Sequence, residues 1–217
     1  MNMNHALIQF FVAVVFGTMI FSHLTKKNFG ASMAYGVQSL AVAALLFGSF
    51  LETQNKLILI VVICALIVKV VMAPLFFSRL IRKHALMFSA STYLNTPLTL
   101  IAIAILTFIA HSQKFAAVTG IVPANQALLS LALAAMFLSL FLIVNRKGAL
   151  SHIIGILSLE NSIVVFTIFA GLEQSPALQL GILFNIFIWL MIAQVFISML
   201  YKHFGSLNIT SMQSLKG

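Results

Sequence analysis

Long apolar blocks alternate along the chain with short clusters of polar and charged residues. The blocks lack the alternation of apolar and polar positions that is typical of membrane β-strands, and each can cross a bilayer core as a helix of roughly 20 residues. The pattern predicts an all-α polytopic membrane protein with about seven transmembrane helices. We place these helices near residues 6–22, 31–50, 57–77, 96–112, 124–144, 150–171 and 177–200.

Composition supports lipid as the surrounding solvent. Of the 217 residues, 62% are hydrophobic and 7% are charged, whereas a soluble domain is about 45–50% apolar and about 25% charged. The net charge of +9 does not indicate nucleic-acid binding, because the basic residues are scattered between apolar blocks and form no basic face. Cys64 is the one cysteine of the sequence, so neither a disulfide framework nor a cysteine-based metal site is expected.

The positions of Lys and Arg predict the orientation, because cytoplasmic loops carry an excess of these residues. With the C-terminus in the cytoplasm, the inward-facing basic residues are Lys26, Lys27, Arg79, Arg82, Lys83, Arg146, Lys147, Lys202 and Lys216. Lys56 and Lys114 then face outward. We therefore expect an outside N-terminus and a cytoplasmic C-terminus.

Two ionisable residues are predicted to lie near the middle of their spans. Glu160 is about 15 Å into the sixth helix, at 1.5 Å per residue, and Lys69 lies at a similar depth in the third. A charge at this depth costs about 2.5–3.5 kcal/mol on insertion scales, so such residues normally face the bundle interior and mark ion or proton paths. The alternative is that each residue pairs with a partner and locks two helices together.

Six histidines raise the question of a haem or a metal. Their spacing includes no His-x-x-His or Glu-x-x-His pair, and no two histidines are predicted at mid-helix depth. We therefore expect no metal site and no cofactor in this chain. A haem between His23 and His152 is the alternative that depth alone allows.

The region from Asn145 onward resembles a known family. Its sequence, NRKGALSHIIGILSLENSIVV…ALQLGILFNIFIWLMIAQVFI with the ending LNITSMQSLKG, is similar to the last three helices of component E of formate hydrogenlyase-type (hydrogenase 4) membrane complexes. That part of component E is in turn similar to the K subunit of respiratory complex I, the bacterial counterpart of the mitochondrial 4L subunit. The N-terminal half follows the order of component E: a basic loop, a helix with Gln38 and Ser39, then a helix with Lys69 before Pro74.

This resemblance implies an organisation into three regions. Residues 1–95 would be an N-terminal three-helix region, residues 96–144 two connecting helices, and residues 145–217 a K-subunit-like region with a short cytoplasmic tail. In the alternative, the second connecting helix belongs to the C-terminal unit. Glu160, in the sequence Leu159-Glu160-Asn161, matches the first buried glutamate of the K subunit.

The resemblance also implies a function and a set of site residues. The chain would be a non-catalytic membrane subunit of an oxidoreductase complex in a bacterial or archaeal cytoplasmic membrane, without a cofactor of its own. Its partners would be antiporter-like and other membrane subunits and, indirectly, a peripheral redox module. Its proton or cation path would run through Glu160, Lys69, Asn161, Gln179 and Asn185. Gln179 and Asn185 stand where the family tends to have Glu and Asp, and amides form hydrogen bonds but carry no proton.

Two other functions remain open from the sequence. A purely structural subunit of the same complex would use the buried charges as a lock. A stand-alone ion transporter would normally show internal repeats or matching broken helices, and the chain shows no such symmetry: Pro74 and Pro97 have no counterparts in the second half.

Overall fold

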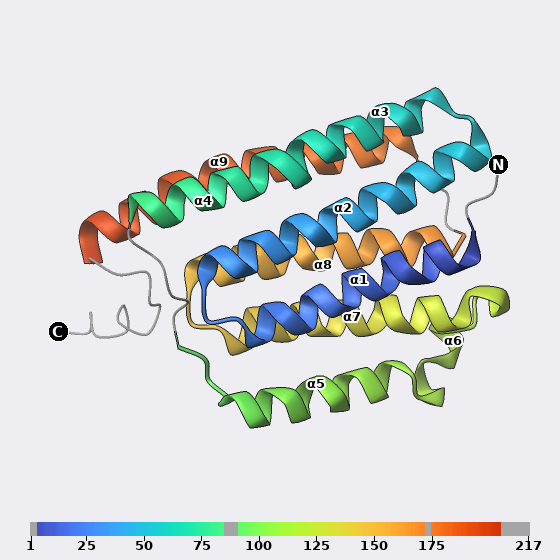
Figure 1. Cartoon of the computed structure of the whole chain (residues 1–217), viewed down its shortest axis with the longest axis horizontal. Helices are drawn as coiled ribbons and strands as arrows, with labels where there is room; N and C mark the ends of the chain where they lie inside the picture. Colours follow the sequence, from blue (N-terminus) through green and yellow to red (C-terminus); the bar gives the residue numbers. More distant parts are fainter. Residues whose placement is uncertain (1–3, 85–90, 172–174, 205–217) are drawn as a thin grey trace.

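The computed structural model describes residues 4–84, 91–171 and 175–204, which form helices joined by short connections (Figure 1). Within these ranges no β-strand occurs, apart from an isolated bridge between Thr92 and Arg146. Six of the described helical segments are long and apolar enough to cross a membrane, and one bent helix pair makes a seventh if it is counted as one span. The predicted all-α class is confirmed, and the helices are those of a multi-pass membrane protein.

The helices follow the predicted spans closely, with ends that differ by a few residues. The long helices are α1 (His5–Leu24), α2 (Asn28–Thr53), α7 (Gln126–Asn145), α8 (Ala149–Phe169) and α9 (Pro176–Phe204). The third span consists of α3 (Lys56–Ala65), the π-helix η1 (Leu66–Met72) and α4 (Ala73–Lys83). Three short helices, η2 (Gln113–Phe115), α6 (Ala116–Thr119) and η3 (Pro123–Asn125), precede α7.

The fourth predicted span is the one that the structure shortens. Helix α5 (Thr96–Ala110) has 15 residues, and the chain then bends by 51° into the segment Gln113–Thr119. The start of α5 is well defined, because the Asn95 side chain accepts a hydrogen bond from the Leu98 N–H and Pro97 occupies the first turn. The helix is short for a bilayer core, which is why the number of spans is six or seven.

The bundle has a central group of four helices and two flanking layers. Helix α1 packs against α2 and α7, and α8 packs against α7 and α2. Helices α3 and α4 with α9 lie along one edge of this group, and α5 lies along the other edge against α7 (Figure 1). The main core includes Val15, Leu129 and Val165, so residues from all three predicted regions pack into one core.

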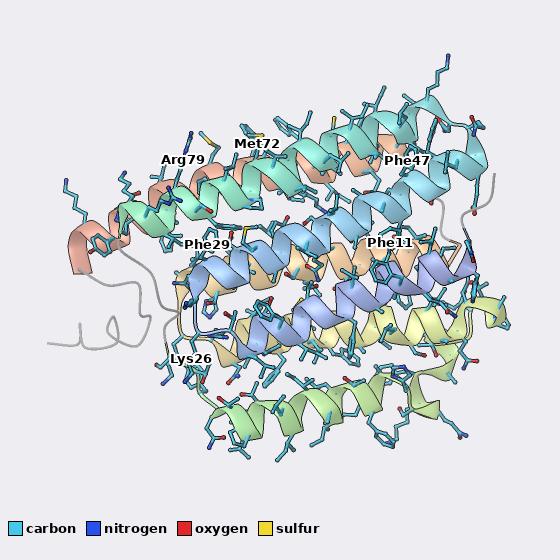
Figure 2. All side chains as sticks on the ribbon, in the orientation of Figure 1. Phe11, Lys26, Phe29, Phe47, Met72 and Arg79 are labelled. Carbon is cyan, nitrogen blue, oxygen red and sulfur yellow. The ribbon has the colours of Figure 1, made fainter. Side chains whose placement is uncertain are left out.

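The two ends of the bundle differ in charge. One end, which we call the basic end, carries Lys26, Lys27, Arg79, Arg82, Lys83, Arg146, Lys147 and Lys202. In Figure 2 the labelled Lys26 and Arg79 lie toward this end. The other end, which we call the opposite end, carries Lys56 and Lys114. Which side of a membrane each end faces stays a prediction.

The third span changes its helical pitch around Lys69. Pro74 has no backbone N–H and cannot continue the regular hydrogen-bond ladder, and just before it the Ala73 N–H donates to the Val68 carbonyl, five residues back. The span therefore runs as a π-helix through Leu66–Met72, a form that often occurs at functional sites. Gly36 of α2 allows a close approach here, because a Cβ atom at this position would lie 3.0 Å from Pro74 Cγ.

Candidate functional site

The two mid-span charges that the sequence singles out contact each other. Lys69 Nζ of η1 and Glu160 Oε2 of α8 form an ion pair. The Lys69 side chain is 4% exposed, whereas 20% of the Glu160 side chain is exposed, although its Oε2 atom is buried. The pair itself is therefore enclosed, and another part of the Glu160 side chain reaches the surface. Burial of two paired charges is tolerated where each also has hydrogen-bonding partners.

Asn161 joins this pair to a third helix. Lys69 Nζ donates a hydrogen bond to Asn161 Oδ1 at 2.8 Å. Asn161 Nδ2 donates to Ser39 Oγ at 2.9 Å and to Gln38 Oε1 at 3.3 Å, both on α2. We call these five residues, Gln38, Ser39, Lys69, Glu160 and Asn161, the mid-span polar layer. The mid-span polar layer therefore links α2, η1 and α8.

The helix lengths place this layer in the middle of the bundle. Lys69 is about 20 Å from the start of α3, and Glu160 is about 16 Å from the start of α8, at 1.5 Å per residue. Gln38 is about 15 Å from the start of α2. The polar residues of all three spans therefore lie at the same depth. Lipid offers no hydrogen bonds there, so these side chains must form hydrogen bonds with one another.

A line of buried polar residues extends from this layer along α2 toward the basic end. Ser32 Oγ, Tyr35 Oη and Gln38 Nε2 are buried without a hydrogen-bond partner of good geometry. The Tyr35 hydroxyl lies near Ser39 and close enough to the Glu160 carboxylate for an electrostatic interaction. We call Ser32, Tyr35 and Gln38 the α2 polar stripe. Unpartnered buried polar atoms are typical positions for bound water, because each would otherwise lose its hydrogen bonds on burial.

The two predicted site residues on α9, Gln179 and Asn185, lie apart from the mid-span polar layer. Gln179 lines a cavity of about 510 Å³ at the opposite end, together with Ser49, Thr53 and Asn55. Asn185 lies on the exposed face of α9. Of the five predicted site residues, the structure thus brings Lys69, Glu160 and Asn161 together and places Gln179 and Asn185 elsewhere.

The α2 residues of this site are not among the site residues predicted from the sequence. Gln38 and Ser39 carry part of the resemblance but have no predicted partner, and Tyr35 and Ser32 have no predicted role. The sequence does contain a signal, since Ser32, Tyr35 and Ser39 recur at spacings of three and four within a mainly apolar helix. Such spacing puts polar side chains on one helix face.

The two histidines considered for a haem bind backbone carbonyls instead. His23 Nε2 donates to the Leu138 carbonyl at 3.0 Å, and the His23 ring stacks on Phe141. His152 Nε2 donates to the Arg146 carbonyl at 2.6 Å. Among the residues that the structure describes, no three His, Cys, Asp or Glu side chains gather as metal ligands. These observations give the haem alternative no support.

Arg146 at the basic end is a second buried cation. Its Nη2 donates to the carbonyls of Ser22, His23 and Thr25 at 3.0, 2.8 and 2.7 Å. Burial lowers the pKa of the Arg146 guanidinium from its usual value, but an arginine remains protonated at any physiological pH. Arg146 therefore acts as a fixed positive charge that caps the last turn of α1.

Comparison of the chain with known proteins finds no relative. No protein-family model matches the chain, and no match was found among curated proteins or among solved structures.

Proposed function

We propose that the chain is an ion-coupling membrane subunit of a complex I-like or group 4 hydrogenase-like assembly, in which Lys69 and Glu160 belong to a proton or cation path. The observation that carries the proposal is the Lys69–Glu160 ion pair at mid-span, held by Asn161, with part of the Glu160 side chain at the surface. Charged residues at this depth normally mark ion or proton paths. Glutamate and lysine both exchange protons, and the amide of Asn161 can orient them without titrating.

The surroundings of the pair support a path to the basic end. The α2 polar stripe starts at Gln38, in the mid-span polar layer, and continues through Tyr35 to Ser32. Its unpartnered atoms are positions at which water molecules would complete a chain of hydrogen bonds toward Glu160. The exposed part of the Glu160 side chain offers a second connection, toward a neighbouring protein or water.

The exposed face of α9 supports the assignment as a subunit of an assembly. This face carries Gly181, which has no atom within 4 Å of the Cβ position, and Asn185 one turn further along. Small residues allow close approach of helices in membranes, and an amide in lipid gains by bonding across to another helix. The position of Asn185 on this face therefore fits an interface with an antiporter-like or other membrane subunit better than contact with lipid.

Replacement of Glu160 in the native assembly tests the path. Glu160→Gln keeps the shape of the side chain and removes its proton exchange, so proton-coupled turnover should fall at least tenfold while the assembly stays intact. Glu52→Gln is the matched control, because Glu52 is exposed at the end of α2, far from the pair. Coupled turnover at the normal rate in an intact Glu160→Gln assembly would refute the path.

A purely structural role has support from the same contacts, because the mid-span polar layer ties three helices together. The double variant Lys69→Met/Glu160→Gln separates the two roles. The double variant leaves no uncompensated buried charge. If the ion pair only locks the helices together, coupled turnover should therefore stay normal in this variant. A path predicts that the double variant assembles normally and remains uncoupled.

The subunit interface can be tested separately. Gly181→Leu and Asn185→Leu should each reduce copurification of the partner subunits. Gly17→Leu on the exposed face of α1 is the control, because a Cβ atom there also meets nothing within 4 Å. Equal copurification of all three variants with the partners would place the interface elsewhere.

A further inference from the structure

A groove between α4 and α9 opens near the basic end of the bundle. It has a volume of about 550 Å³. Its apolar lining includes Met72, Leu75 and Met191, and its basic lining consists of Arg79, Arg82 and Lys83. We call these three cations the groove cluster. All three side chains are exposed.

The groove changes from apolar to basic along its length. Met72, Leu75, Arg79 and Arg82 recur at spacings of three and four, so they share one face of the span. Met72 and Arg79 project from the same side of the span, away from α2 (Figure 2). The groove cluster occupies the last two turns of α4, where a membrane span reaches the headgroup level. An amphiphile with a negative head and an apolar tail matches this order.

Among the residues that the structure describes, no acidic side chain lies beside the groove cluster. The sequence has three acidic residues, Glu52, Glu160 and Glu173. Glu160 is engaged by Lys69 at mid-span, and Glu52 lies at the opposite end. In the described ranges, no carboxylate comes within ion-pair distance of the groove cluster. Three cations on one face therefore create a field that attracts anions from outside the chain.

Contacts next to the groove cluster hold the end of α4 against α9. The His84 ring packs on Tyr201 of α9, with 4.6 Å between the ring centroids, and Ser198 Oγ lies 3.4 Å from His84 Nε2. These contacts join the end of α4 to α9 beside the groove cluster. The groove is thus formed before a ligand enters it, which lowers the cost of binding.

We propose that this groove binds an anionic phospholipid, with the phosphate at the groove cluster and an acyl chain along Met72, Leu75 and Met191. Guanidinium groups pair with phosphate oxygens through two parallel hydrogen bonds, and Lys83 adds a third positive charge. Basic pockets between transmembrane helices bind anionic headgroups in this way. The inference does not depend on the proposed ion path, because it uses no residue of the mid-span polar layer.

Lipid titration of the full-length chain in a neutral detergent tests the site. Phosphatidylglycerol with oleoyl chains should bind saturably by native mass spectrometry, and phosphatidylcholine with the same chains at least tenfold more weakly. Each of Arg79→Gln, Arg82→Gln and Lys83→Gln should weaken phosphatidylglycerol binding about fivefold. Lys26→Gln and Lys27→Gln remove charges from the same end but not from the groove, and they should change binding less than twofold.

The apolar part of the site has its own test. Met191→Trp narrows the groove and keeps every charge, so it should weaken phosphatidylglycerol binding at least fivefold. Met199→Trp places the same side chain on an exposed position of α9 that does not line the groove, and it should have little effect. This pair of variants also decides the question if a charge variant fails to fold.

Three outcomes would overturn the proposal. Equal binding of the two lipids would show that the charges contribute nothing. A silent Met191→Trp, together with full competition by inorganic phosphate, would show that the cations bind a free anion and not a lipid. Unchanged phosphatidylglycerol binding after loss of all three groove cations would place the lipid site elsewhere.

Discussion

The mid-span polar layer and the groove cluster place cations of one continuous helical segment, Lys56–Lys83, in opposite surroundings. Lys69 is buried and paired with Glu160, whereas Arg79, Arg82 and Lys83 are exposed without a described carboxylate in range. Depth explains the contrast, because a charge at mid-span must find its partner within the protein, and a charge at the interface can use water or lipid headgroups. The residue type alone does not decide how a cation is accommodated.

The largest effect should come from breaking the buried pair. Lys69→Met leaves the Glu160 carboxylate at mid-span, beside Asn161, without a counter-charge, and the free energy of unfolding should fall by about 3 kcal/mol. Titration of the detergent-solubilised protein with a denaturing detergent, followed by circular dichroism, measures this change. Arg82→Met is the comparison in the groove cluster, and it should stay within about 0.5 kcal/mol of the parent.

A second variant decides whether charge or packing causes the loss. Lys69→Met/Glu160→Gln removes both charges, so most of the stability lost in Lys69→Met should return. Persistent loss in the double variant would show that Lys69 contributes by its packing in η1, and the contrast between the two groups of cations would then no longer rest on charge.

Arg146 extends the comparison to a buried cation that binds carbonyls. Arg146→Gln removes the charged donor to the carbonyls at the end of α1, and it should lower the free energy of unfolding by about 2–3 kcal/mol. The neighbouring Lys147→Gln is the control. Its ammonium lies 4.6 Å from the centroid of the Tyr93 ring, a contact worth about 0.5–1 kcal/mol. Equal losses in the two variants would contradict the capping role of Arg146.

The close approach of α2 to the third span gives a third test. Gly36→Leu inserts a side chain where even a Cβ atom would lie 3.0 Å from Pro74 Cγ, and overpacking of this kind costs about 1–3 kcal/mol. The separated helices should also weaken the bonds from Asn161 to Gln38 and Ser39. Gly17→Leu, with open space around the Cβ position, should be nearly silent in the same unfolding assay.

The smallest effect concerns the pH dependence of stability at His84, which follows the groove cluster in sequence. Burial, and secondarily the charge of Lys83, lowers the pKa of His84 below its usual 6.5. The folded protein therefore takes up this proton at lower pH than the unfolded chain does, so the contribution of His84 to stability is complete above about pH 6.5 and declines as the pH falls further.

The measurement compares unfolding midpoints between pH 8 and pH 5. His84→Gln should flatten the decline on the acidic side, whereas His111→Gln, exposed at the opposite end, should leave the slope unchanged. An acidic slope that survives in His84→Gln would assign the decline to another group.

The helices and the depth of the charges could be predicted from the sequence. Apolar blocks of sufficient length determine spans almost on their own, and the position of Lys69 or Glu160 within a block gives its depth. The fourth span was harder, because α5 is cut short by the polar stretch after His111 and continues at an angle. Hydropathy sums residues over a window and is insensitive to such a bend.

The contacts of the site could not be predicted in the same way. Depth brings Lys69 and Glu160 to one level, but only the packing of η1 against α2 and the position of α8 decide which side chains meet. Asn185 illustrates the limit, since it is an amide within a span, as Asn161 is, yet it lies on the exposed face of α9. The rotation of each helix about its axis depends on neighbours that are distant in sequence.

The π-helix η1 at Leu66–Met72 determines how the third span would respond to a change in its length. A π-helix accommodates one residue more than a regular turn over the same rise, so a deletion of Val70 or Val71 can be absorbed by conversion to an ordinary α-helix. Helices α3 and α4 would keep their places in the bundle, while the side chain of Lys69 would rotate about the helix axis. A shortened protein of this kind would insert and fold as the parent does, with its ammonium group aimed at different neighbours.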